Sequence, residues 1–286
     1  MYSLTIRTAH YLPEKGVKEM HYLRLYIRFI MVYLRTRMEY KFAFFMDMFI
    51  QIFTYSVMYF GIWIMLDHFQ TIKGWTYYEI MFVYNLNLFS YGLSGLFFWS
   101  PMRQLEGMIQ SGEFDGLLTK PIPSFLHLIF RQFNHAFLGH IVLGSVVFIY
   151  CMTKLDVMWT AWNVLLLIVI VIGAMLIQSS IIIMTGCVSF WFVKSNSFVD
   201  IMIYGFRFFL NYPLSIYHKI IQIFLTVIIP YGFINFYPSL LFLRKEGQSL
   251  FPDFFKYGTP VVGVILFSIA LFTWSIAVNK YQSTGS

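Results

Sequence analysis

The chain has 286 residues, of which 59% are hydrophobic and 12% are charged, and its formal net charge is +7. A soluble domain usually carries about 25% charged residues and could not hide so much apolar surface in one core. The composition therefore excludes an ordinary soluble protein and predicts an all-α, polytopic membrane protein. Its basic residues lie beside apolar runs, so we expect membrane lipids as partners and no nucleic acid.

The N-terminal region precedes the first long apolar run. We expect residues 1–18 to form a cytoplasmic tail and residues 19–40 to form an amphipathic helix at the inner membrane interface. At about 100° per residue, this helix has an apolar stripe made of Leu23, Ile27, Ile30 and Leu34. Its basic ridge, expected to contact lipid headgroups, consists of Arg24, Arg28 and Arg35. The alternative is that this region simply extends the first membrane span.

The remaining residues, 41–286, are expected to form one transmembrane domain. A helix that crosses a bilayer needs about 20 mostly apolar residues. The expected spans are residues 42–66, 78–99, 125–150, 160–192, 218–242 and 258–279. The loops that would then face outward hold few of the basic residues, namely Lys73, Lys154, Arg244, Lys245 and Lys256. This asymmetry predicts a plasma-membrane protein with both termini in the cytoplasm.

Residues 197–216 interrupt the apolar pattern, notably with Arg207 and Pro213. We expect a helix at the inner membrane surface here, followed by a turn at Tyr212 and Pro213, because proline disfavours helical geometry in the residue before it. The alternative is a kinked span that begins near Phe198, which would change the topology of the residues that follow.

Sequence motifs for catalysis and nucleotide binding are absent. The dipeptide Gly-Lys never occurs, so the chain lacks a phosphate-binding P-loop, and we expect no catalytic residue, metal site or cofactor. The best enzymatic candidates left are His127, His135, His140 and Asn134 in the third expected span. His135 and His140 lie about 140° apart around a helix and could not share a metal ion there. We favour polar contacts between helices for these side chains.

Polar side chains inside the expected spans are few. Residues 157–193 contain no charged side chain, which argues against coupling to a proton or ion gradient. The second span carries a polar face that fits either a substrate path or a packing seam, and it consists of Asn87, Ser90, Tyr91 and Ser94. Gly139 and Gly173 are expected to be packing positions.

The expected cytoplasmic loop, residues 100–124, is longer than a simple connector requires. Ser100 and Pro101 fit the start of a short helix, and Gly112 fits its end. The loop presents acidic, aromatic and apolar groups. These groups fit two interpretations, a docking site for a partner and a loop that lies along the membrane surface. The candidate coupling residues are Arg103, Glu106, Gly112, Glu113, Phe114, Asp115, Leu118, Lys120 and Pro121.

Four stretches, in the same order along the chain, resemble the ABC-2 family of transporter permeases. The resemblance is to the six-helix subgroup long grouped as uncharacterised permease components. Residues 112–123 resemble its Gly-x-Leu/Phe-Asp-x-Leu-Leu-x-Lys/Arg-Pro stretch, and residues 212–217 resemble its Tyr-Pro-x-Ser-Ile-Tyr segment. Residues 230–238 and 281–286 are also similar to this subgroup.

This resemblance implies the permease subunit of an ATP-driven exporter. Its partners would be a second permease, identical or homologous, and two copies of a separate ATPase subunit that binds the ATP and Mg. Residues 101–123 would couple that ATPase to the spans. Glu113 and Asp115 would contact basic groups of the ATPase, and Phe114 and Leu118 would be apolar anchors.

Two alternatives from other classes stay open. One is an intramembrane lipid-modifying enzyme built on His135, His140 and Asn134. The other is a non-transporting membrane protein with a role in assembly or immunity, which would bind a membrane partner and move nothing.

Overall fold

The computed structural model describes residues 15–192 and 195–282, and this part of the chain is helical apart from loops and one isolated β-bridge. The longer helices are α1 (Lys15–Met38), α2 (Lys41–Phe69), α3 (Tyr77–Ser94), α4 (Ser100–Gln110), α7 (Leu138–Lys154), α8 (Ala161–Cys187) and α12 (Thr259–Asn279). Further helices are α5 (Glu113–Leu118), α6 (Ser124–Arg131), α9 (Asn196–Asp200), α10 (Lys219–Ile223) and α11 (Gly232–Phe242), which is as long as α4. Within the described ranges, 5 helices are long and apolar enough to cross a membrane, which confirms the predicted all-α polytopic fold.

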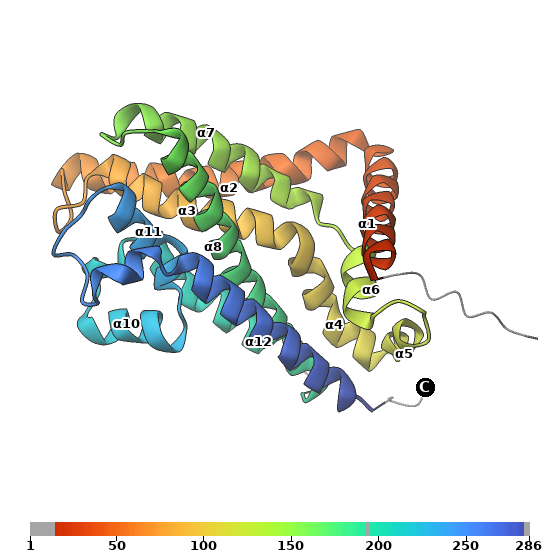
Figure 1. Ribbon diagram of the computed structural model, residues 1–286. Coiled ribbons are helices and arrows are strands. Elements are labelled where there is room, and N and C mark those ends of the chain that lie inside the picture. The colour runs from red at the N-terminus through yellow and green to blue at the C-terminus, as the bar shows by residue number, and fades with distance from the viewer. Residues whose placement is uncertain (1–14, 193–194, 283–286) are drawn as a thin grey trace, which may run out of the picture.

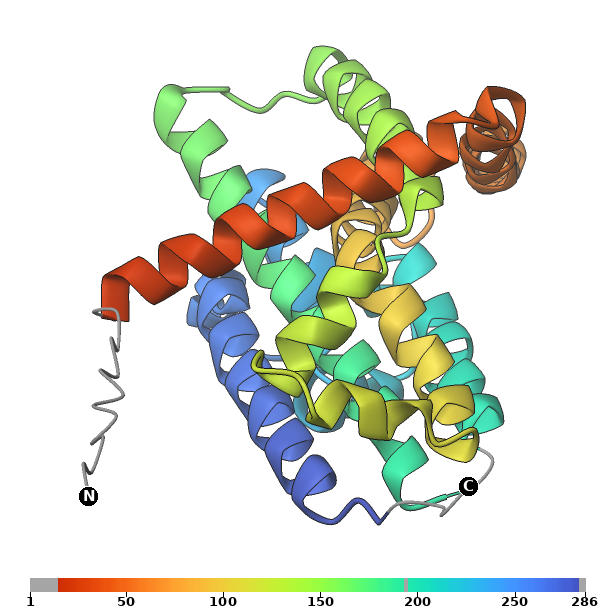
Figure 2. The ribbon, with the colours of Figure 1, turned by 90° about the vertical axis from the view of Figure 1, so that its right-hand side faces the viewer.

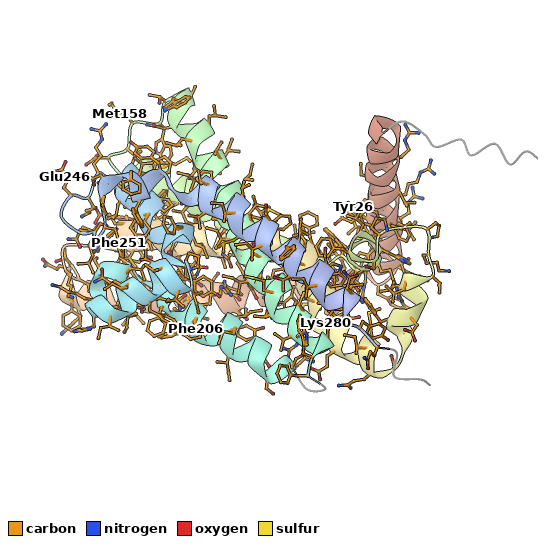
Figure 3. The ribbon with its side chains drawn as sticks, turned by 60° about the horizontal axis from the view of Figure 1, so that its bottom comes forward. Tyr26, Met158, Phe206, Glu246, Phe251 and Lys280 are labelled. Atoms are coloured by element: carbon orange, nitrogen blue, oxygen red, sulfur yellow. The ribbon has the colours of Figure 1, made fainter. Side chains whose placement is uncertain are left out.

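Helices α2, α3, α7, α8 and α12 run between two ends of a bundle (Figure 1). We call one end, which α1, α4, α5 and α6 form, the α5 end. The opposite end, the Lys73 end, contains residues 70–76, 215–219 and 243–258, and the Lys73 ammonium donates to the Ser215 carbonyl there (3.3 Å). The labelled residues of Figure 3 mark both ends: Met158, Glu246 and Phe251 lie at the Lys73 end, and Tyr26 and Lys280 lie at the α5 end.

The second span continues without a break into the expected coupling loop. The helical run Tyr77–Gln110 has 34 residues and includes a π-helical turn at Gly95–Trp99. At 1.5 Å per residue it is about 51 Å long, whereas the hydrocarbon core of a bilayer is about 30 Å thick. The α4 segment therefore projects beyond the span. We expected a helix to start at Ser100. This prediction was wrong, because the Ser100 backbone is already helical and continues the run.

Helix α1 lies across the α5 end of the bundle, and a turn at residues 39–40 separates it from α2 (Figure 2). The basic ridge is exposed as expected, whereas its contact with lipid stays a prediction. The apolar side differs from the expected stripe, because Tyr26 stacks on Phe130 of α6 at 4.6 Å between ring centroids. The helix is therefore rotated about its axis relative to the predicted orientation, and Ile27 is 48% exposed. The side that packs on the core consists of Tyr26, Ile30, Tyr33 and Leu34.

The third span is shorter than residues 125–150. Helix α6 ends at Arg131, and the apolar helix that could cross a membrane begins at His135. Asn134 sits at the break: its backbone N–H donates to the Leu96 carbonyl (3.1 Å), and its side chain accepts from the Ala136 N–H (3.2 Å). These bonds satisfy backbone groups that a continuous helix would have paired internally. The expectation of one unbroken helix here was wrong.

Residues 195–216 connect the two ends of the bundle, which corrects the expected helix at the inner surface. The segment starts beside Glu106 on α4 and finishes at Ser215, which accepts a hydrogen bond from Trp75 at the Lys73 end (2.9 Å). It contains α9, a π-helical turn at Ile201–Gly205 and a 3-10 turn at Phe208–Asn211. Phe206 lies between the two ends (Figure 3). The kinked span considered as the alternative describes this path.

The segment expected as the fifth span, residues 218–242, is bent and is not one helix. Lys219–Ile228 and Gly232–Phe242 meet at an angle of 109°. Pro230 lies at the bend, and it restricts the residue before it to extended geometry, which Ile229 adopts (φ −118°, ψ 97°). Both outer ends of this pair lie at the Lys73 end, so the pair enters the bundle and returns to the same end.

Glycines bring the central helices into close contact. A Cβ atom on Gly263 of α12 would lie 2.5 Å from the carbonyl oxygen of Gly173 on α8, and a Cβ atom on Gly139 of α7 would lie 2.6 Å from the Met48 carbonyl on α2. Any side chain at these positions would force the helices apart. The packing role predicted for Gly139 and Gly173 is therefore confirmed.

Candidate functional site

Helices α4, α5 and α6 form a compact block at the α5 end, and this block contains the predicted coupling residues. Gly112 joins α4 to α5 with a left-handed backbone (φ 72°), a geometry that glycine adopts without strain. Glu113 on α5 forms an ion pair with Arg131 on α6 (2.8 Å). Both side chains are well exposed to solvent, so this pair adds little stability.

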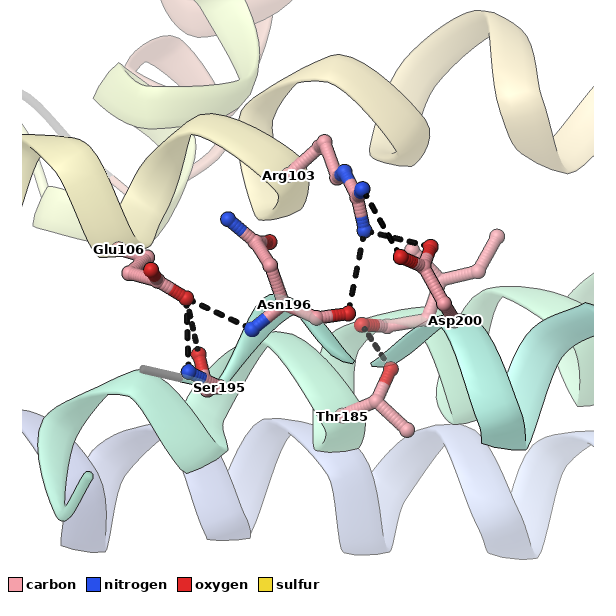
Figure 4. A network of polar contacts seen from close by, with 7 residues as sticks. Arg103, Glu106, Thr185, Ser195, Asn196 and Asp200 are labelled. Carbon is pink, nitrogen blue, oxygen red and sulfur yellow. Dashed lines mark hydrogen bonds and ion pairs between the residues drawn. The ribbon is translucent and has the colours of Figure 1, made fainter. Parts of the chain in front are cut away.

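Glu106 holds the start of α9 against α4 (Figure 4). Its carboxylate accepts hydrogen bonds from the backbone N–H groups of Ser195 (2.7 Å) and Asn196 (2.6 Å) and from the Ser195 hydroxyl (3.0 Å). Burial would raise the pKa of Glu106, but these hydrogen bonds outweigh that effect and lower it. The carboxylate therefore stays ionised at neutral pH and satisfies donors at the start of α9.

Arg103, one turn before Glu106, fixes the other end of α9. Its two terminal nitrogens donate to the two carboxylate oxygens of Asp200 at 2.7 and 3.1 Å, and one of them also reaches the Asn196 carbonyl (3.3 Å). Such a two-point pair fixes geometry as well as distance. We call the contacts of Arg103 and Glu106 with residues 195–200 the α9 clasp.

Phe114 points into the protein and not toward a partner. Its side chain is completely buried, and its ring lies 5.0 Å from Tyr281, 5.1 Å from Phe190 and 6.3 Å from Trp274. These residues follow or belong to α8 and α12. The chain's own core already covers the Phe114 ring, and the role of Phe114 as an apolar anchor for the ATPase stays a prediction.

The surface around α5 contains both apolar and charged groups. Leu118 is 43% exposed, and no atom would lie within 4 Å of a Cβ added to Gly116. Asp115 is half-buried, whereas Lys120 and Pro121 are exposed. Together, the exposed groups Gly116, Leu118, Lys120 and Pro121 form what we call the α5 surface.

His127 on α6 lies close to this surface without adding charge to it. Burial, together with the positive charges of Arg131 and Lys120, lowers the pKa of the imidazole. The side chain is therefore mainly neutral at pH 7 and acts as a polar packing residue.

The polar face of the second span joins two helices. Gln178 of α8 donates to the Asn87 carbonyl (3.0 Å) and to the Ser90 hydroxyl (2.8 Å), and Ser179 donates to Ser94 (3.0 Å). Asn87, Ser90 and Ser94 are all fully buried. They form a seam between α3 and α8 in this arrangement, and their role in a substrate path stays a prediction.

The residues proposed for an enzyme do not meet at one point. Asn134 donates to Ser100 (3.0 Å), whereas the His135 ring accepts from or donates to Tyr33 (3.1 Å) and lies 3.1 Å from Asp47. His140 is packed against the rings of other residues. No group of three metal-binding side chains occurs in the ranges that the structure describes.

Arg207 was predicted to lie at the inner membrane surface, and this prediction was wrong. It is buried in the middle of the bundle, with its guanidinium 3.4 Å from the centroid of the Tyr91 ring and a hydrogen bond to the Tyr55 hydroxyl (3.3 Å). Tyr91 thus faces residues 195–216 and not the seam with α8. An arginine inside an apolar run was the sequence signal, since such residues are costly in membranes and usually functional.

Comparison with known proteins gives a match to a protein family. A family model described as "ABC-2 family transporter protein" matches residues 52–285. No curated protein sequence and no solved structure matches the chain.

Proposed function

The chain belongs to the ABC-2 family of transporter proteins, and on this premise we propose that it is the permease subunit of an ATP-driven exporter that receives its energy at the α5 end. As a transmembrane component it is not itself the ATPase. ATP and Mg would be bound by a separate ATPase subunit, present in two copies. A second permease, identical or homologous, would complete the path for the substrate.

One observation carries the coupling role of the α5 end. The block of α4, α5 and α6 is connected to three other parts of the bundle through buried or multiple contacts. Phe114 links α5 to the ends of α8 and α12, and the α9 clasp links α4 to residues 195–216. A displacement of α5 would therefore reach these elements together, since packed side chains transmit strain.

The proposed mechanism follows from these contacts between the block and the rest of the bundle. Closure of the ATPase dimer pushes on the α5 surface, and the block moves as a unit against the ends of the spans. ATP drives transport only if it favours one arrangement of the permease pair over the other, so the ATPase must contact the two arrangements differently. The Glu106 and Arg103 side chains act here as internal links, and Leu118 and Lys120 are the proposed contacts with the ATPase.

The orientation that this mechanism requires agrees with the charge distribution. The α5 end would face the cytoplasm, together with both termini, and the Lys73 end would face outward. Lys219 now joins the outward set, but most basic residues still lie toward the α5 end. The excess of lysine and arginine on the cytoplasmic side is the usual rule for membrane proteins.

A bulky side chain on the α5 surface tests this proposal. Gly116→Leu adds a side chain in open space, so the permease should fold normally while its ATPase is displaced and co-purifies at a reduced level. Gly61→Leu is the matched control, because no atom would lie within 4 Å of a Cβ at this helical glycine of α2 either. Equal recovery of the ATPase with both variants would contradict a docking role for the α5 surface.

The enzymatic alternative receives no support from the geometry. His135, His140 and Asn134 each have separate surroundings, as described above. Replacing both histidines by alanine should therefore leave the association with the ATPase intact.

A further inference from the structure

Arg207 is surrounded by tyrosine rings and lacks an acidic partner. It is 8% exposed, and its closest contacts are the ring of Tyr91 and the ring and hydroxyl of Tyr55. None of the ion pairs among the described residues involves Arg207. Attraction to aromatic faces compensates part of the cost of burying a charge, but it does not neutralise the charge.

Two hydrogen-bond donors at this position have no acceptor. The Nε–H group of Arg207 is buried without a partner, and so is the hydroxyl of Tyr84. Buried donors are almost always paired, so each unpaired donor requires an explanation. The two residues come from different elements and line the same cavity, so an acceptor from outside the chain that entered this cavity would lie close to both donors.

That space is a cavity of about 150 Å³, which we call the Arg207 cavity. It is lined by Tyr55, Met58, Tyr84, Tyr204, Arg207, Phe208 and Asn211. The wall is uneven in exposure: Arg207 and Tyr84 lie at the buried side, whereas Tyr204 is 51% and Phe208 is 60% exposed. The cavity therefore opens on the flank of the bundle, between the two ends and not at either of them.

We propose that the Arg207 cavity binds the anionic headgroup, a phosphate or a carboxylate, of an amphipathic molecule that enters from the flank of the bundle. The guanidinium of Arg207 would bind the headgroup, and the Tyr84 hydroxyl would donate a further hydrogen bond. Guanidinium groups suit this task because they bind oxyanions with two parallel donors. The apolar part of the molecule would lie outside, along Phe208 and Tyr204.

The size of the cavity fits a headgroup and is small for a whole drug-sized ligand. Sites for drug-sized molecules usually measure about 300–1,000 Å³, and the Arg207 cavity is smaller than this range. An amphipathic molecule with one buried anionic group and exposed chains satisfies both the charge and the volume. This inference rests on the proposed function only where the molecule is the exported substrate, since a resident lipid would offer the same chemistry.

The test measures binding of short-chain lipids to the purified full-length chain in a neutral detergent, by native mass spectrometry and calorimetry. Dioctanoyl phosphatidic acid is the anionic probe, and dioctanoylglycerol, which lacks the phosphate, is the neutral one. We expect one molecule of the anionic probe to bind at least about tenfold more tightly, as a charge-assisted hydrogen bond allows. Equal binding of the two probes would overturn the proposal.

Two variants and one control locate the site. Arg207→Gln should weaken binding of the anionic probe by about tenfold or more. Met58→Trp should do the same by filling the cavity while Arg207 is retained, which covers the case that Arg207→Gln fails to fold. Arg244→Gln, an exposed arginine at the Lys73 end, should bind as the unmodified chain does. Folded variants of Arg207 and Met58 that bind normally would refute the site.

A second arm distinguishes the source of the headgroup and separates this inference from the proposed function. In a complex with the ATPase, a probe that ATP releases is exported substrate, and a probe that stays bound is a resident lipid; either result supports the site. A complex that retains its ATPase but never binds the anionic probe would refute the Arg207 cavity alone. Loss of the ATPase with normal binding would refute the proposed function alone.

Discussion

Phe114 belongs to the proposed docking segment, but its side chain packs in the interior of the protein. Replacing it by alanine removes a completely buried ring, so Phe114→Ala should lower the stability of the permease by about 3–5 kcal/mol. The thermal midpoint of the purified protein in detergent measures this loss. Leu118→Ala is the control on the same helix and should change stability by about 0.5 kcal/mol or less, because its side chain lies at the surface and is 43% exposed.

The opposite pattern would contradict the internal role of Phe114. If Phe114→Ala left the thermal midpoint unchanged and abolished ATPase binding, the ring would be a direct anchor on the partner, as the sequence alone suggested.

Glu106 makes the α9 clasp sensitive to pH. Its pKa is lower in the folded chain than in the unfolded chain, so its stabilisation is present at neutral pH and disappears as the pH falls through the lowered pKa. Glu106→Gln should cost about 1–3 kcal/mol at pH 7, and the difference from the unmodified chain should shrink on acidification. Thermal midpoints measured along a pH series would show this.

The control for that series is Glu246→Gln, since Glu246 is exposed at the opposite end. A difference between Glu106→Gln and the unmodified chain that does not change with pH would contradict a role for the ionised carboxylate.

At this scale the sequence predicted residue types better than their surroundings. It singled out Arg103, Glu106 and Phe114 as a group, and the structure does bring them to one end of the molecule. Their partners could not be predicted, because Asp200 and Trp274 are distant in sequence and no local pattern links them to α4 or α5. The position of Arg207 was predicted wrongly for the same reason. Tyrosines from α2 and α3, which are distant in sequence, compensate part of the free-energy cost of burying its charge.

Among the elements, the segment around Lys219 separates two topologies. Both ends of the bent pair formed by residues 219–242 lie at the Lys73 end, so a cysteine at Lys219 should react from the same side as one at Lys73. The measurement uses a membrane-impermeant maleimide on intact cells, with the buried Cys151 and Cys187 replaced. A cysteine at Ser111 on the α5 end is the control for the opposite side and should react only after lysis.

The result that contradicts this topology is equally direct. If the cysteine at Lys219 reacted only after lysis, together with that at Ser111, residues 219–242 would cross the membrane as the sequence first suggested.

The elements that the sequence predicted correctly are the long, uniformly apolar ones. The expected spans at 42–66, 160–192 and 258–279 correspond to α2, α8 and α12, because length and hydrophobicity alone define a crossing helix. The third and fifth expected spans were wrong because the backbone bends inside them, at a polar stretch (residues 131–135) in the third and within an apolar run in the fifth. Pro230 and Asn134 mark these bends, and their effect depends on the bonds that the surrounding helices offer.

At the scale of the whole molecule, the two described chain ends lie at the α5 end, and the widest exposed apolar surface belongs to α2. An all-helical bundle with such a surface requires lipid or another protein around its flank. The arrangement places every proposed contact with the ATPase at one end and the Arg207 cavity between the two ends. Energy input and headgroup recognition are thus separated in space but share residues 195–216.

Purification of the tagged protein from native membranes is the most direct test of whether a separate ATPase drives this chain. The material is solubilised in a mild detergent, and the proteins that accompany it are identified by mass spectrometry. We expect a soluble ATPase of the P-loop type in about equal amount to total permease. A preparation that preserves other membrane complexes but contains no such ATPase would contradict it.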